Sequence, residues 1–258
     1  MRDVIFEADG AIAVVTLNRP DRRNALTRAM YDELARICRE MPEDGPMKAL
    51  IVRGGGDRAF AAGTDMTEFR GFSEPQDALD YEAQMDRVLG DIERCALPTI
   101  AAITGACTGG GAAIAAACDL RVCDARLKFG FPIARTLGNC LSIGNLNRLS
   151  ALIGPGRVRE IIFTARLVGA EEALAAGLVA EVLEDAEATH ARAREMAALV
   201  ASHAPLTLRA TKEALRRLRV EGPGADASDL ITRTYMSADF REGMEAFLGK
   251  RAPDWTGR

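Results

Sequence analysis

The sequence predicts an α/β fold with a helical region at its C-terminal end. Two observations support this prediction. Up to about residue 142, segments with the apolar pattern of strands alternate with segments of helical period, which favours a sheet with crossover connections. After that point nearly all of the chain has a helical pattern. The change from alternating strands and helices to helices alone is complete near residues 190–200. We therefore expect an α/β core over residues 1–195 and a helical region over residues 196–258.

Six segments have the composition of strands. They are Val4–Glu7, Ile12–Leu17, Ala49–Val52, Thr99–Ile103, Leu120–Cys123 and Val179–Val182. Asp9-Gly10 separates the first two, and this dipeptide tolerates positive φ, so together they predict a β-hairpin. Residues 60–65 (FAAGTD) are small and are interpreted as a loop.

Helices are predicted from periodicity and from start signals. Met30, Leu34 and Cys38 recur near the helical period. Ser73 and Gln76 fit a capping box at the start of a second helix. The helices are expected over Thr27–Glu40, from Ser73 to about Glu93, from Gly109 to Cys118, on either side of Gly154-Pro155-Gly156, and three or four times between Ala186 and Gly249.

Composition excludes several classes of protein. The 258 residues are 48% hydrophobic and 27% charged, as in ordinary globular proteins, which excludes intrinsic disorder. A net charge of -4 gives no electrostatic reason to bind nucleic acid. The only histidines are His190 and His203, which excludes a His-rich metal site. The cysteines lack C-x-x-C spacing and the N-terminus has no signal-peptide pattern, so we expect a cytoplasmic protein with reduced thiols.

Residues 95–118 carry no charge and are long enough to suggest a membrane span. Pro98, Gly105 and the run Gly109-Gly110-Gly111 interrupt this segment. A buried strand, a glycine turn and a buried helix explain it better. The sequence therefore predicts no membrane association.

The run Gly109-Gly110-Gly111 lies between a predicted strand and an uncharged helix. N–H groups at a helix start lack intrahelical acceptors and lie at the positive end of the helix dipole, and glycine lets a ligand approach closely. These features suit an oxyanion site, and tight packing of helix on strand explains them equally well. A dinucleotide fingerprint is excluded because Ile114 stands at its third glycine position, and no phosphate-loop lysine follows.

Short motifs spread over the whole chain carry a family resemblance. They are Asn18-Arg19-Pro20, Asn24-Ala25-Leu26, residues 59–65 (AFAAGTD), residues 98–103 (PTIAAI), Gly109-Gly110-Gly111, Cys118-Asp119-Leu120, residues 169–173 (GAEEA), residues 176–179 (AGLV) and residues 247–251 (FLGKR). In this order they resemble the crotonase (enoyl-CoA hydratase/isomerase) superfamily. The resemblance implies a crotonase-like spiral of ββα turns with a C-terminal helical region, and a homotrimer or dimer of trimers. It also implies acyl-CoA substrates, with coenzyme A as part of the substrate and no metal or separate cofactor.

The resemblance also implies site residues. The backbone N–H groups of Thr64 and Gly110 are expected to hold the oxygen of an enolate-like thioester. The expected contacts with coenzyme A are Arg22, Arg23, Ala25, Ala62, Asp65, Met66 and Lys250. Arginines suit phosphates, although solvated side chains are the alternative for the two arginines and the lysine. Asp65 is expected to be structural rather than catalytic. Lys250 is expected to reach a phosphate of coenzyme A bound to a neighbouring subunit.

The chain departs from the family at the two glutamates of its hydratases. Ala113 and Ile133 stand at these positions, and neither side chain transfers protons. Arg135 is a candidate to bind a carboxylate or polarise a carbonyl, with an internal salt bridge as the alternative. Asp86 is a candidate base, with a solvated helix face as the alternative.

The acyl pocket is expected to contain Ala113 and Ile133, together with Asn139, Cys140 and Ser142, for which ordinary packing is the alternative. The leading hypothesis is an acyl-CoA enzyme in which isomerisation, decarboxylation or another enolate reaction competes with hydration. The rival hypothesis is a CoA-thioester-binding protein without turnover. A serine peptidase on a related fold is disfavoured, because no histidine lies between residues 1 and 189.

Overall fold

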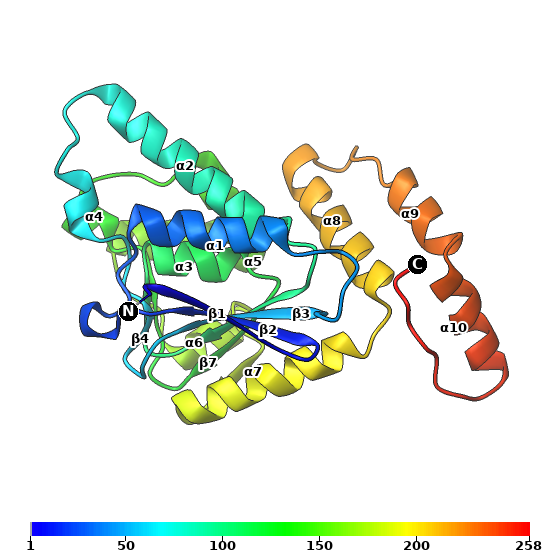
Figure 1. Cartoon of the computed structure of the whole chain (residues 1–258). Coiled ribbons are helices and arrows are strands. Elements are labelled where there is room, and N and C mark those ends of the chain that lie inside the picture. The colour runs from blue at the N-terminus through cyan, green and yellow to red at the C-terminus, as the bar shows by residue number, and fades with distance from the viewer. Residues whose placement is uncertain (1) are drawn as a thin grey trace.

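Two sheets form the centre of the molecule in the computed structural model, which describes residues 2–258 (Figure 1). The larger sheet has the spatial order β1 (Val4–Asp9), β2 (Ile12–Leu17), β3 (Ala49–Gly54), β5 (Thr99–Ile103), β7 (Leu120–Asp124) and β9 (Glu181–Leu183). β1 and β2 pair antiparallel as the predicted hairpin, and the other neighbours are parallel. The last strand begins two residues later than predicted.

The smaller sheet was not predicted. It joins β4 (Ala59–Ala61), β6 (Ala106–Thr108) and β8 (Lys128–Gly130) in parallel. The prediction of a loop from residue 60 is therefore wrong at its start, because Phe60 and Ala61 belong to β4. Strands of three residues are too short to show a period of two. The chain passes from the larger to the smaller sheet in the pairs β3–β4, β5–β6 and β7–β8, each followed by a helix, which confirms the predicted spiral of ββα turns.

Helices cover both faces of the larger sheet (Figure 1). On one face, α1 (Arg28–Glu40), α2 (Pro75–Glu93) and α3 (Gly110–Ala117) enclose the main apolar core. On the other face, α7 (Ala186–Ala201) packs its buried Ala193 and Ala197 against the strands. The predicted boundary at residue 195 thus falls inside a helix of the core, and the helices that leave the core begin after α7.

Helix starts follow from local hydrogen bonds. Thr27 caps α1, since its hydroxyl accepts the N–H of Met30. The capping box of α2 is formed by Glu74 and Asp77, not by the predicted Ser73 and Gln76. The Asp77 carboxylate accepts the N–H groups of both Ser73 and Glu74, which fixes the box one residue later.

The remaining helices complete the molecule. They are the 3-10 turns Pro20–Arg22 and Met66–Phe69, α4 (Ile133–Thr136), α5 (Ile143–Thr164), α6 (Ala170–Ala175), α8 (Pro205–Glu221), α9 (Ser228–Tyr235) and α10 (Ala238–Leu248). Gly154 interrupts α5 with φ 75° and ψ 152°, at the predicted break. α9 and α10 extend away from the body on the side opposite α4 (Figure 1). Over residues 2–258, no helix combines the length and apolarity that a membrane crossing needs.

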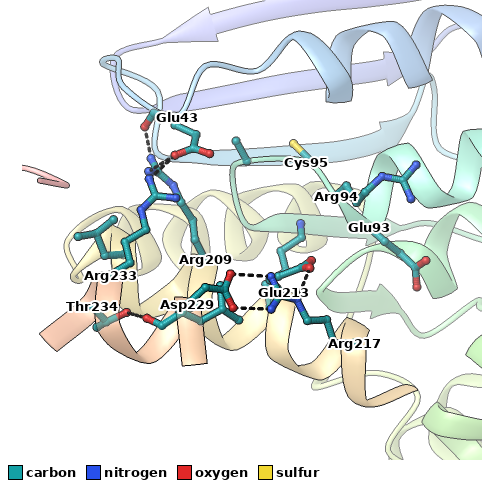
Figure 2. Close-up of a pocket in the computed structure, with 15 residues that line it drawn as sticks. Glu43, Glu93, Arg94, Cys95, Arg209, Glu213, Arg217, Asp229, Arg233 and Thr234 are labelled. Atoms are coloured by element: carbon teal, nitrogen blue, oxygen red, sulfur yellow. Dashed lines mark hydrogen bonds and ion pairs between the residues drawn. The ribbon is translucent and has the colours of Figure 1, made fainter. Parts of the chain in front are cut away.

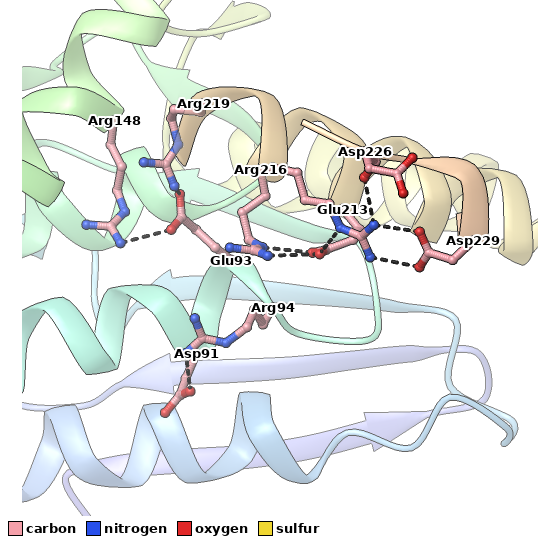
Figure 3. A network of polar contacts seen from close by, with 10 residues as sticks. Asp91, Glu93, Arg94, Arg148, Glu213, Arg216, Arg219, Asp226 and Asp229 are labelled. Carbon is pink, nitrogen blue, oxygen red and sulfur yellow. Dashed lines mark hydrogen bonds and ion pairs between the residues drawn. The ribbon is translucent and has the colours of Figure 1, made fainter. Parts of the chain in front are cut away.

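An ion-pair network ties α8 to the core (Figure 3). Glu93 of α2 accepts from Arg148 of α5 at 2.9 Å and from Arg219 of α8 at 2.5 Å. The Arg148 side chain is only 7% exposed. Loss of one partner would leave a poorly solvated charge, which is strongly destabilising, so this network fixes where the helical region leaves the core.

Candidate active site

A cavity of about 290 Å³ lies where α1, α2, α3, α4 and the start of α5 meet. Apolar side chains form much of its wall, among them Met85, Leu89, Phe131, Leu137 and Leu141. We call it the acyl cavity. Apolar surroundings of this kind strengthen electrostatic interactions made beside them.

Two glycine turns meet at one wall of the acyl cavity. Gly63 has φ 101° and Gly109 has φ 52°, conformations that favour glycine. A β-carbon on Gly109 would lie 3.5 Å from the Cα of Gly63, so the two turns are in contact. The residues that follow them, Thr64 and Gly110, also line the cavity.

The backbone N–H groups of Thr64 and Gly110 have no backbone acceptor among residues 2–258. Gly110 is the first residue of α3, where an N–H has no acceptor within the helix. The neighbours differ: Gly109 N–H donates to Gly130 and Asp65 N–H donates to Leu26. The two turns thus leave one unpartnered donor each beside the same cavity.

Three hydroxyl groups support this wall. The Thr64 hydroxyl lies 2.8 Å from the hydroxyl of Tyr31 and 2.8 Å from that of Tyr81. A β-carbon on Gly110 would lie 1.8 Å from the Tyr31 hydroxyl, so this phenol fills the space that the glycine leaves. Burial raises the pKa of both phenols, which therefore stay neutral near pH 7. Sequence reasoning missed both tyrosines, because each is a single aromatic residue on an amphipathic helix.

Two apolar side chains occupy the wall of the acyl cavity at the positions where the sequence lacks glutamate. Ala113 and Ile133 both line the acyl cavity and are 5% and 8% exposed. Their apolar side chains add to the wall and offer no proton.

Asp86 lies outside the acyl cavity, contrary to its expected role as a base. Its carboxylate accepts the Ser142 hydroxyl at 2.8 Å and lies 3.5 Å from an Arg148 nitrogen. Glu82, one helical turn earlier on α2, lines the cavity instead. Burial raises the pKa of Glu82, the charge of Asp86 raises it further, and the nearby Ser142 N–H opposes the shift. In the sequence, the one signal for Glu82 as a site residue is that it precedes Asp86 by four residues, which places both on one face of a helix.

The segment after Ile133 supplies less of the cavity than expected. Asn139 lines it, but Cys140 is exposed and Ser142 caps α5 by accepting the Asn145 N–H. The predicted lining roles of Cys140 and Ser142 are therefore wrong. Arg135 is exposed on α4, outside the cavity and without an ion pair among residues 2–258, so neither of its predicted roles is seen.

The expected coenzyme A contacts divide into two groups. Ala62 and Met66 line the acyl cavity, next to Thr64. Asp65 is structural: it accepts the Thr67 hydroxyl at 2.8 Å and Arg19 at 2.9 Å. These hydrogen bonds, led by those from Thr67, lower its pKa to about 2.

The second group lies away from the acyl cavity. Arg22 is exposed, and Arg23 borders a separate depression beside Gly55. Ala25 serves the fold through its carbonyl, which accepts Arg19 at 2.6 Å. Lys250 comes two residues after the end of α10, and α10 lies on the side of the molecule opposite α4 (Figure 1). Within one chain, Lys250 therefore does not approach the cavity.

A second cavity of about 340 Å³ lies between α8, α9 and the segments around Glu43 and Cys95 (Figure 2). Its charged side chains bind one another: Arg233 lies 2.5 Å from Glu43, and Arg217 lies 2.6 Å from Asp229. We interpret it as a polar contact between the helical region and the core. Across residues 2–258, no three His, Cys, Asp or Glu side chains gather in a way that could hold a metal ion.

The ββα spiral and the paired glycine turns define an α/β protein of the crotonase class. The family model for enoyl-CoA hydratase/isomerase matches residues 7–258. A short-chain-enoyl-CoA hydratase from Clostridium acetobutylicum is 33% identical, covering 97% of this chain and 96% of that protein. A crotonyl-CoA hydratase from Syntrophomonas wolfei is 31% identical, covering 96% of both chains. The crystal structure of an enoyl-CoA hydratase/carnithine racemase from Magnetospirillum magneticum superposes with a TM-score of 0.91 at 36% identity, covering 100% of this chain and 97% of that one. The chain belongs to the enoyl-CoA hydratase/isomerase family.

Proposed function

We propose that this protein is an enzyme that binds acyl-CoA thioesters and stabilises their enolate form. The observation that carries the proposal is the pair of unpartnered N–H groups, those of Thr64 and Gly110, beside one apolar cavity. When a carbon next to a thioester loses a proton, negative charge moves onto the carbonyl oxygen. Two fixed donors lower the energy of that charge most when it is greatest, and one such donor is worth roughly 3–4 kcal/mol in other enzymes.

The same cavity argues against efficient hydration. Ala113 and Ile133 remove the two groups that would activate water and protonate the carbon. We therefore propose an enolate reaction that needs no added water, such as double-bond isomerisation or decarboxylation. Binding of acyl-CoA without turnover is the second candidate, favoured by the same two apolar side chains.

Two measurements test the proposal. Calorimetry with a panel of short and medium acyl-CoA esters should show binding, and crotonyl-CoA hydration should be slower by at least roughly 10²-fold than in a relative with both glutamates, since each acid–base role contributes about 10²–10⁴-fold. Product formation from any ester in the panel separates an enzyme from a binding protein. Absence of heat with every ester would overturn the proposal, and hydration as fast as in that relative would overturn the argument from Ala113 and Ile133.

A further inference from the structure

The acyl cavity contains one carboxyl group. Of the side chains that line it within residues 2–258, the ionisable ones are Tyr31, Tyr81 and Glu82. Both phenols are hydrogen-bonded to Thr64 and remain neutral at ordinary pH. Among residues 2–258, Glu82 therefore supplies the only carboxyl of this lining that can take up and return a proton.

The groups around Glu82 leave its carboxyl group available for proton transfer. The residue is half-buried on α2, and the cavity lining contains no lysine, arginine or histidine to neutralise it. The charged group that acts on it is Asp86 from its own helix, and the Ser142 N–H faces it from the start of α5. Arg148, the nearby cation on α5, lies beside Asp86 and Glu93. Within residues 2–258, this leaves the Glu82 carboxyl without an ion-pair partner.

Asn145 provides a second and independent observation. Its side chain lines the same cavity, is 6% exposed, and its Oδ1 has no hydrogen-bond partner. A buried polar atom without a partner is unfavourable, so this position suits a bound polar group. Asn145 lies in the first turn of α5, three residues after Ser142, whose N–H faces Glu82. Glu82 and Asn145 thus place two polar side chains at the part of the cavity where α2 meets the start of α5.

We propose that Glu82 is the catalytic residue that moves protons on the acyl chain, in place of the two absent glutamates, and that Asn145 binds a polar atom next to it. This inference rests on the proposed function. The Glu82 carboxylate takes a proton from the carbon next to the thioester carbonyl. The C–H electron pair forms a carbon–carbon double bond, and the π pair of the C=O bond moves onto the oxygen beside Thr64 and Gly110. Return of a proton to the same carbon, after the carboxylic acid has exchanged its proton with solvent, gives deuterium uptake. Where the substrate carries a neighbouring double bond, return of the proton to a more distant carbon of the dienolate gives double-bond isomerisation, and neither outcome needs a co-reactant.

The test compares Glu82→Gln with Asp80→Asn. Both changes remove one carboxylate from α2, but Asp80 is exposed and outside the cavity. The assays are deuterium uptake from D₂O into butyryl-CoA and isomerisation of 3-hexenoyl-CoA. Glu82→Gln should lower kcat by about 10²–10⁴-fold, with acyl-CoA affinity within about threefold of wild type. Asp80→Asn should keep wild-type rates.

The pH profile adds a readout that a structural role would not change. Because Glu82 acts as a carboxylate, wild-type kcat should rise with pH through one ionisation above the ordinary carboxyl range, and Glu82→Gln should lose this limb. Glu82→Asp, which withdraws the carboxyl by one methylene, should be slower but keep the limb, and it replaces Glu82→Gln if that variant does not fold.

Three outcomes overturn the proposal: turnover within threefold of wild type in folded Glu82→Gln, an unchanged pH profile in that variant, or no exchange and no isomerisation by wild type. Absence of acyl-CoA binding by wild type would instead show that the proposed function itself is wrong.

Discussion

At the scale of single residues, Gly110 has two roles, and a substitution must test one of them without disturbing the other. Its N–H is an unpartnered donor beside the acyl cavity, and its missing side chain makes room for the Tyr31 hydroxyl. Any larger residue at 110 would meet that hydroxyl, whether or not it kept the N–H. A test of the donor therefore has to remove the phenol oxygen first.

We predict different outcomes for Gly110→Ala and Gly110→Pro when both are made in a Tyr31→Phe background. Alanine keeps the N–H and proline lacks it, while proline fits the first position of a helix. Deuterium uptake into butyryl-CoA should be about 10²–10³-fold slower with proline than with alanine. Circular dichroism should show that both variants are folded. Equal rates in the two variants would mean that the Gly110 N–H is not the donor.

Asp65 makes stability depend on pH. In the folded protein its pKa is about 2, below the ordinary aspartate value of 3.8, because Thr67 and Arg19 donate to the carboxylate. A lowered pKa contributes stability above the unfolded value, and this contribution is lost as pH falls through the folded value. The free energy of unfolding of wild type should therefore exceed that of Asp65→Asn at pH 6, and the gap should narrow below about pH 4.

Urea titrations at several pH values between 3 and 6 measure this gap. The control is Asp21→Asn, because Asp21 is exposed and its carboxylate has no side-chain partner among residues 2–258. Its free energy of unfolding should stay close to that of wild type at every pH. A gap between wild type and Asp65→Asn that stayed constant down to pH 3 would contradict the role given to Thr67 and Arg19.

At the scale of elements, α5 shows how one glycine sets the path of a helix. Gly154 has φ 75° and ψ 152°, a region that residues with a side chain rarely adopt, and Pro155 follows it. Gly156 lies two residues later with ordinary helical backbone. No atom lies within 4 Å of a β-carbon built on either glycine, so crowding does not distinguish them.

We predict that Gly154→Ala and Gly156→Ala have opposite effects. Gly154→Ala should lower the free energy of unfolding by about 1–3 kcal/mol because of backbone strain. Gly156→Ala should leave it unchanged or raise it by up to about 1 kcal/mol, since alanine favours a helix. Urea denaturation of the two variants measures both effects. A neutral Gly154→Ala would show that the kink does not require positive φ.

At the scale of the whole molecule, α9 and α10, which we call the helical arm, carry apolar side chains that the rest of the chain does not cover. On α10, Phe247 is 83% exposed, Leu248 is 76% exposed and Met244 is 50% exposed. Ile231 and Tyr235 of α9 are also exposed. Apolar groups gathered in this way mark an interaction surface.

We predict that the protein is a trimer or a multiple of one in solution. Light scattering at micromolar concentration should give the mass of three or six chains. Replacing Met244 and Phe247 together by aspartate should shift the protein to smaller species, because charges at a buried interface are costly. Leu79→Asp on α2, an exposed apolar residue away from the arm, should keep the wild-type mass. A monomeric wild type would contradict the prediction.

The sequence predicted those features that repeat along the chain or depend on neighbouring residues. The hairpin of β1 and β2, the strands of the larger sheet and the break in α5 follow from apolar periodicity and turn residues, which are local signals. The assignment of Thr64 and Gly110 as the two donors came from the family resemblance and stays a prediction. The strands of the smaller sheet were missed, because three residues are too few to show a period of two.

What only the tertiary structure decided is which side chains share the acyl cavity. Asp86 and Glu82 are both acids on one helix, and the sequence cannot tell which of them faces the cavity. Packing of α2 against the start of α5 turns Asp86 toward Ser142 and Arg148 and leaves Glu82 in the lining. The contact of Tyr31 with Gly110 likewise joins residues 79 positions apart. Such choices depend on contacts between distant segments, which local sequence patterns do not encode.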